Sequence, residues 1–166
     1  MTIQTLFDLD DLVAFIIRAR NHGYVGYAKE IKNPQRPGFK EFEHYKEGAF
    51  EYVDSYAGHF YAPGQEVVRF NGMPVWNMAY NGGMLPRFHG ISELARETSE
   101  FLKQALLKVD INRPFRGPSS YIHLPFMYMD KSEGDITNFK GTEKIFLTSD
   151  EVFRQDYIGG LIIHKK

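Results

Sequence analysis

Cysteine is absent from the 166-residue chain, and tryptophan occurs only once. Without cysteine there are no disulfide bonds, no thiolate catalysis and no cysteine-liganded zinc. This composition fits a reducing compartment, and we therefore expect a cytoplasmic protein. The chain also lacks a Gly-x-Ser-x-Gly motif, a phosphate-binding loop and a dinucleotide fingerprint. It therefore carries no signature of the enzyme classes that these motifs mark.

Long apolar runs are missing as well, and none approaches the roughly 20 residues that span a bilayer. The N-terminal segment MTIQTLFDLDDL has no basic region followed by an apolar run, so we expect no signal peptide. The 20 basic and 21 acidic residues nearly cancel, which leaves no net field to hold a nucleic-acid backbone. We expect neither membrane insertion nor direct nucleic-acid binding.

Metal-ligand spacing is also absent from the sequence. None of the six histidines has another histidine four residues away, and no Asp or Glu lies at a recognisable ligand offset from them. We therefore expect no metal site and no cofactor.

Aromatic side chains, in contrast, are abundant, with 10 tyrosines and 14 phenylalanines. Apolar residues make up 43% of the chain, which is enough for one hydrophobic core or for two very small, tightly joined units. Such a composition builds its core and any pocket from aromatic rings.

The second half of the sequence repeats the first. At an offset of 76 residues, and of 77 after one inserted residue, eleven residues are identical across the 39 positions from Tyr45 to Gly83. Unrelated sequence of this composition would give about two or three identities. The identical pairs include Asp54 with Asp130, Glu66 with Glu143, Tyr52 with Tyr128 and Tyr80 with Tyr157.

Apolar spacing and turn residues predict the secondary structure. Helices are expected over Asp8–Asn21 and Ser92–Val109, with Ser92 as the second N-cap, and a long loop over Gly23–Gly38. Asn71-Gly72 predicts a tight hairpin, and Pro74 an edge or a bulge. The predicted strands are Phe39–Lys46, Ala49–Tyr56, Gln65–Phe70, Met73–Tyr80, Tyr121–Met129, Asp135–Phe139, Glu143–Thr148 and Glu151–Tyr157.

These elements predict an α+β fold in which a helix-plus-antiparallel-sheet unit is duplicated. The two repeats cover about residues 8–83 and 91–163 of a single domain, 1–166, with Asn81-Gly82-Gly83 ending the first unit. Each copy can cover the apolar sheet face of the other, so we expect pseudo-two-fold symmetry and one shared globule. The seam between the repeats is then the expected place for a cleft.

Residues that match between the repeats are expected to serve the fold first. The glycine pairs 58/134, 64/141, 82/159 and 83/160 are interpreted as turn residues with unusual backbone angles. Asp54 and Asp130 are interpreted as caps of tight turns, with general acid–base chemistry as the alternative. The matched tyrosines are expected to be core rings with a hydroxyl at the rim.

Residues that break the symmetry are freer to form a site. Trp76 aligns with Phe153 and serves as either core or pocket wall. Arg116 lies in a loop that Pro114 and Pro118 stiffen, where it can bind a ligand carboxylate or phosphate, or form a structural ion pair. The predicted ligand-binding residues are Tyr52, Tyr56, Trp76, Tyr80, Arg116 and Tyr128.

Five segments carry a resemblance to a known family: Asp54-Ser55-Tyr56, Gly64–Val68, Pro74–Met78, Pro114–Pro118 and Tyr157–Gly160. From about Leu9 to Ile163 the chain resembles an uncharacterised bacterial domain of unknown function. That domain occurs alone or behind a Cro/C1-type helix-turn-helix in transcriptional regulators. The resemblance implies an effector-sensing role and brings no catalytic residues. No helix-turn-helix precedes the first expected helix here, so direct DNA binding is not expected.

Three functions remain open at this point. The favoured one is binding or sensing of a small molecule in an aromatic-lined cleft at the seam. The second is a protein-interaction or oligomerisation module, with a homodimer as one form and an exposed strand edge near Met73–Met78 as its marker. The third is an enzyme that uses Asp54 or Glu66 in acid–base chemistry, although no catalytic residue can be assigned and we favour a non-enzymatic function.

Overall fold

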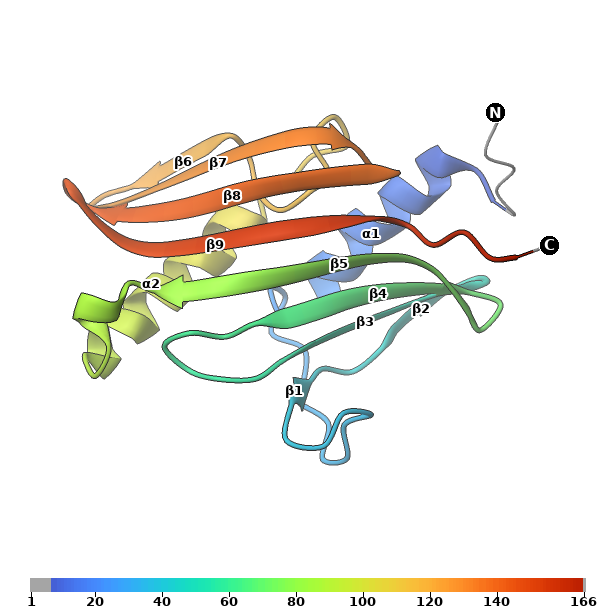
Figure 1. Ribbon diagram of the computed structural model, residues 1–166, viewed down its shortest axis with the longest axis horizontal. Coiled ribbons are helices and arrows are strands. Elements are labelled where there is room, and N and C mark those ends of the chain that lie inside the picture. Colours follow the sequence, from blue (N-terminus) through green and yellow to red (C-terminus); the bar gives the residue numbers. More distant parts are fainter. Residues whose placement is uncertain (1–6, 166) are drawn as a thin grey trace.

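A single antiparallel sheet runs through the computed structural model, which describes residues 7–165 (Figure 1). Within that range it has nine strands, and both α-helices lie on the same face of the sheet. The predicted domain 1–166 and N-terminal segment extend into residues 1–6 and 166, which lie outside the described residues. In chain order the elements are α1 (Leu9–His22), β1 (Lys40–Glu41), β2 (Tyr45–Glu47), β3 (Phe50–Tyr56), β4 (Gly64–Phe70), β5 (Met73–Met84), the 3-10 turn η1 (Pro86–Phe88), α2 (Ser92–Leu106), β6 (Ser120–His123), β7 (Phe126–Asp135), β8 (Asn138–Leu147) and β9 (Asp150–Leu161).

The strand order places the two halves of the chain side by side. The order is β1-β3-β4-β5-β9-β8-β7-β6, with β2 also paired to β3. The central pair β5–β9 sets Tyr80 directly opposite Tyr157. These two tyrosines occupy matching positions in the two halves of the sequence. From this central pair outward, the order β5-β4-β3 in the first half corresponds to the order β9-β8-β7 in the second half. The α+β prediction is confirmed, with a helix and an antiparallel set of strands in each half.

The two helices form where the sequence pattern places them. In α1 the side chain of Asp8 accepts a hydrogen bond from the backbone N–H of Asp10 at 2.7 Å, which caps the first turn. The helix ends at Gly23. In α2 the predicted N-cap was wrong: Ile91 precedes the helix without a side-chain cap, and Ser92 is its first residue. Neither helix in the described part of the chain is long and apolar enough to cross a membrane.

Each helix covers the strands of its own half. From α1, Leu12, Phe15, Ile16 and Ala19 are fully buried against the first set of strands, and the Phe15 ring stacks on Phe50 with centroids 4.9 Å apart. From α2, the buried stripe packs on the second set: Ala95, Phe101, Leu102, Ala105 and Leu106. The helix stripes and sheet faces thus bury each other, as expected for layers of opposite apolar faces.

The hairpin predictions hold in the first half, and the strand ends differ. Asn71 and Gly72 both have positive φ, as the tight two-residue turn requires. Opposite Pro74 the register slips between Val68 and Arg69, which confirms a bulge. The predicted strand Phe39–Lys46 is in fact two short strands, because β1 and β2 differ by one residue in their register with β3.

Several predicted strands are longer or divided differently in the structure. Asn81-Gly82-Gly83 does not end the first unit but continues β5, paired with β9. In the second half the predicted strand Tyr121–Met129 turns back on itself at Leu124-Pro125 to form β6 and β7. The predicted gap after Phe139 is absent, because β8 passes through Gly141 without a break.

Gly64 and Gly141 correct another expectation. Neither is a turn residue: each lies in a strand, opposite Tyr80 and Tyr157 respectively. A Cβ atom on Gly64 would lie 2.3 Å from the Tyr80 hydroxyl, and one on Gly141 would lie 2.2 Å from the Tyr157 ring. Glycine is therefore needed so that each tyrosine ring can lie flat across the neighbouring strand.

Candidate functional site

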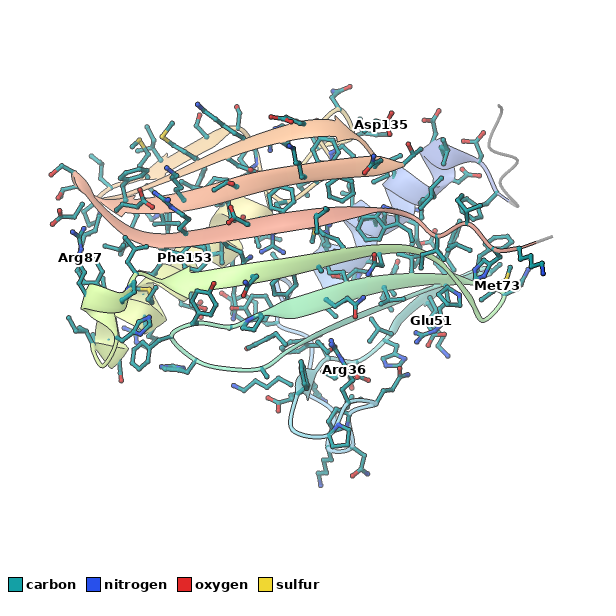
Figure 2. The ribbon with its side chains drawn as sticks, viewed as in Figure 1. Arg36, Glu51, Met73, Arg87, Asp135 and Phe153 are labelled. Atoms are coloured by element: carbon teal, nitrogen blue, oxygen red, sulfur yellow. The ribbon has the colours of Figure 1, made fainter. Side chains whose placement is uncertain are left out.

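Two pairs of acidic residues face each other across neighbouring strands. Asp54 on β3 pairs with Glu66 on β4, and Asp130 on β7 pairs with Glu143 on β8. All four are buried. The prediction that Asp54 and Asp130 cap turns was wrong, because both lie within strands. The turn after β7 is capped instead by Asp135, whose carboxylate accepts the N–H of Thr137 at 2.8 Å (Figure 2). Like charges directly opposite one another are unfavourable, so each pair needs basic partners.

In the second half both carboxylates have such partners. Asp130 accepts hydrogen bonds from Arg113 at 2.9 Å and from the Tyr157 hydroxyl at 2.9 Å. Glu143 accepts from Arg116 at 2.9 Å, and also from the Gln155 amide and the Tyr128 hydroxyl, each at 2.7 Å. This half of the pattern is therefore neutralised by protein side chains alone.

In the first half only one of the two carboxylates is paired. Glu66 binds Arg20 of α1 at 2.8 Å through one oxygen and Arg116 at 3.3 Å through the other. Asp54 accepts a hydrogen bond from the Tyr80 hydroxyl at 2.8 Å, and no arginine or lysine of the described residues forms an ion pair with it. Burial, reinforced by the nearby charge of Glu66, raises the pKa of Asp54 to about 7.

The four matched carboxylates and the arginines that contact them are therefore one cation short. The charge network consists of three arginines and four carboxylates, an excess of one negative charge when all are ionised: Arg20, Arg113, Arg116, Asp54, Glu66, Asp130 and Glu143. The excess belongs to Asp54, because each of the other three carboxylates contacts an arginine. Burying an unpaired charge is costly, so this position is the exception in an otherwise satisfied network.

A cavity of about 310 Å³ opens beside Asp54, between α2 and the strands β3, β4, β5 and β9. Both halves contribute to it, so it lies at their seam. Its aromatic walls come from Tyr24, Tyr52, Tyr56, Phe60, Tyr80 and Phe153. In Figure 2, Phe153 lies on β9 at the end of the sheet near α2. Pockets of this size and mixed lining are typical of small-molecule sites.

Thr98 of α2 adds an unsatisfied hydroxyl to the wall. Its side chain is 1% exposed, and its hydroxyl has no hydrogen-bond partner among the described residues. A buried hydroxyl without a partner is rare in folded proteins. Thr98 and Asp54 both line the cavity, one from the helix and one from the sheet.

A single size difference between the two halves lies at the wall of this cavity, at Ala62. Tyr61 pairs with Gly83 as Asn138 pairs with Gly160, so Ala62 occupies the place that Phe139 has in the second half. The Phe139 ring is buried between Trp76, at 5.9 Å, and Phe115, at 4.9 Å, and fills that space.

Four of the six predicted ligand residues line the cavity: Tyr52, Tyr56, Tyr80 and Arg116. Trp76 and Tyr128 do not. Trp76 is fully buried, and its indole N–H donates to the Ile136 carbonyl at 3.1 Å. Tyr128 is fully buried with its hydroxyl on Glu143. Arg116 forms the structural ion pair that was one of its two predicted roles, with Glu66 and Glu143, and it also lines the cavity.

Sequence reasoning missed Arg20, Arg113 and Thr98. Arg20 lies on the buried face of the amphipathic helix α1. It was missed because only the apolar residues of that helix were used to define the buried face. Arg113 lies three residues before Arg116 in the sequence and was not selected. The matched acidic residues could have revealed the two arginines. Two buried pairs of carboxylates require basic partners, and few arginines lie near the predicted core elements.

Asp54→Asn is expected to stabilise the protein, and more so at pH 8 than at pH 5. The folded-state pKa of Asp54 is about 7, above the value of about 3.9 in unfolded chains. Its stabilising contribution is therefore complete below pH ~4 and is lost as the pH rises through ~7. Asparagine keeps the acceptor for Tyr80 and carries no charge. Thermal unfolding of both proteins at pH 5 and pH 8 measures the difference.

Asp130→Asn is the matched control for this pH dependence. It occupies the corresponding position but pairs with Arg113, so its loss should lower the melting temperature at both pH values. If Asp54→Asn also destabilises the protein at pH 8, the description of Asp54 as the unpaired acid is wrong.

In residues 7–165, no group of three His, Asp or Glu side chains is placed to hold a metal ion.

The chain was compared with protein families, with curated proteins and with solved structures. The family model described as a domain of unknown function (DUF5680) covers residues 54–162, which are 109 of the 166 residues. Neither the curated proteins nor the solved structures compared with the chain contain a significant match.

Proposed function

Because the chain belongs to this family of domains of unknown function, we propose a function from the cavity itself: the chain binds a small organic molecule and acts as a sensing domain. The observation that carries the proposal is an aromatic-walled space of about 310 Å³ with two buried polar groups on its walls: a carboxyl group without an ion-pair partner and a hydroxyl without a hydrogen-bond partner among the described residues. Convergent polar groups in an apolar pocket are the usual sign of a ligand site.

The acid–base alternative has less support from the geometry. Asp54 and Glu66 do converge on the cavity, but both oxygens of Glu66 are bonded to arginines. Asp54 is then the one carboxyl group of the pair that is available to exchange a proton. The interaction-module alternative loses most of its expected marker, because Met73–Met78 lies in β5, which pairs with β4 and, from Trp76 onward, also with β9.

We also infer that the two halves descend from one duplicated unit. The support is that identical residues fall at the same pairings in both: Asp54 opposite Glu66 as Asp130 is opposite Glu143. The glycine–tyrosine pairs follow the same rule. On this view the second half kept the large ring of Phe139, and the first half acquired the small Ala62 at the cavity wall. We also propose a cytoplasmic location, with which the lack of cysteine is consistent.

Ala62→Phe tests the proposed function. The variant copies Phe139 of the other half and should fill the cavity. We expect compounds from a metabolite library to raise the melting temperature of the wild-type protein and to have no effect on Ala62→Phe. A ligand at 100 times its Kd stabilises by about 2.7 kcal/mol, which is readily detected.

Ala79→Phe provides the matched control. Ala79 lies on β5 with its side chain exposed and outside the cavity, so this variant should keep the response to every hit. The proposed function is wrong if no compound stabilises the wild-type protein, or if every hit also stabilises Ala62→Phe.

A further inference from the structure

The unpaired carboxylate of Asp54 points to the class of ligand. Resting on the proposed function, we propose that the cavity takes a small organic cation with an apolar body, and that its protonated nitrogen pairs with Asp54. The ligand would supply the positive charge that the protein provides at the corresponding position of the other half.

That corresponding position shows what the missing partner does. At Asp130, the Arg113 guanidinium lies 2.9 Å from one carboxylate oxygen and also donates to the Gly117 carbonyl at 2.6 Å. At Asp54, Tyr80 occupies one oxygen, and no described residue donates a hydrogen bond to the other. The cavity lies where a basic group would complete the same arrangement, and a charge-assisted hydrogen bond there is stronger than a neutral one.

The remaining walls suit a cation with an apolar body. The aromatic rings of Tyr24, Tyr52, Tyr56 and Phe60 line the cavity. The face of an aromatic ring attracts cations, and both its face and its edge pack well against apolar groups. The Thr98 hydroxyl on the helix side can accept a further N–H bond from a protonated amine. Both groups left unpaired by the protein would then be satisfied by one ligand.

The arginines beside Asp54 do not offer a site for an anion. Arg20 lies on Glu66, and Arg116 divides its hydrogen bonds between Glu66 and Glu143. A bound anion would have to displace one of these glutamates or lie against the unpaired Asp54, and both are unfavourable.

The basic residues at the mouth are also mostly engaged. Arg96 is bonded to Glu93 at 2.5 Å, and Lys103 to Glu100 at 3.4 Å. Lys40 is exposed, and its ammonium lies 5.9 Å from the centre of the Tyr56 ring. Among the charged residues that line the cavity, Asp54 is therefore the carboxylate without an ion-pair partner in the described part of the chain, and Lys40 is the lysine or arginine without one.

The test uses ligands that share a body and differ in charge. The probes are tryptamine, tryptophol and indole-3-acetate, together with benzylamine, benzyl alcohol and benzoate as a smaller set. Calorimetric titration at pH 8 should show that at least one amine binds about tenfold or more tightly than its alcohol, with the carboxylate weakest.

Three variants assign the effect. Asp54→Asn should remove the preference for the amine and leave the alcohol unchanged. Asp156→Asn, which makes the same charge change on the exposed face of β9, should leave the preference intact. Ala62→Phe should abolish binding of every probe. Asp54→Asn is nearly isosteric, and its fold is checked by circular dichroism before titration.

The outcomes separate this inference from the proposed function. If alcohols or carboxylates bind as tightly as amines and Ala62→Phe blocks them, the cavity is a ligand site and the cation class is wrong. The cation class is equally overturned if no amine of either set binds, or if Asp54→Asn keeps the amine preference. The proposed function is tested separately, by the metabolite-library screen of the wild-type protein and Ala62→Phe.

Discussion

Replacement of Glu143 by alanine is expected to lower the free energy of unfolding by about 3–5 kcal/mol. Glu143 is fully buried and accepts hydrogen bonds from Arg116, Gln155 and Tyr128. Its removal leaves a buried guanidinium with one weaker partner, Glu66 at 3.3 Å. Domains of this kind have a total stability of about 5–15 kcal/mol, so the loss is a large fraction of it. Urea unfolding followed by the fluorescence of the single tryptophan measures the change.

Glu133→Ala is the control for Glu143→Ala. Glu133 also pairs with a basic residue, Lys140 at 3.3 Å, but both side chains are largely exposed. Exposed ion pairs contribute about 0–1 kcal/mol, so this variant should unfold almost as the wild-type protein does. A loss below about 1 kcal/mol for Glu143→Ala would contradict the view that Arg116 depends on Glu143 for its burial.

Trp76→Ala should also cost about 3–5 kcal/mol, because it removes a fully buried indole from the centre of the sheet. The ring stacks on Phe139 at 5.9 Å and also lies 5.8 Å from the Arg20 guanidinium. Its loss leaves a cavity between the two halves that the rigid central strands cannot close. Far-UV circular dichroism in urea measures the effect, since the fluorescent probe is lost with the substitution.

Trp76→Phe separates packing from hydrogen bonding at the same position. It retains most of the ring but leaves the Ile136 carbonyl without its donor, which should cost about 1–3 kcal/mol. Neither variant is expected to change the ligand preference at Asp54, because Trp76 lies outside the cavity lining. If Trp76→Phe strongly changed ligand binding while stability stayed the same, Trp76 would have to contribute to the ligand site.

Much of the fold was predictable because its signals are local. The helical spacing of apolar residues located α1 and α2, and Asn71-Gly72 located the β4–β5 turn. The internal repeat indicated which residues belong to corresponding positions. Glycine was harder to interpret: Gly64 and Gly141 resemble turn residues in sequence, and only the register shows that a tyrosine ring lies across each of them.

The site was predictable in part, and the missing part is tertiary. Tyr52, Tyr56, Tyr80 and Arg116 were selected from aromatic content and from asymmetry between the repeats. The deciding features are the absence of a partner for Asp54 and the small side chain at Ala62. Both depend on what lies across the sheet, which no spacing along the chain reveals. Trp76 was selected because it differs from its counterpart Phe153, and such a difference does not distinguish a pocket wall from a core ring.

The sharing of arginines between the halves has a consequence for the chain as a whole. Arg116 follows α2, yet it pairs with Glu66 of the first half, and Arg20 of α1 donates to the Pro114 carbonyl at 2.8 Å. A fragment that ended before α2 would bury Glu66 with Arg20 alone and would lose the backbone acceptor that Arg20 uses. We therefore expect each half to need the other in order to fold, and we expect neither to be stable as a separate module.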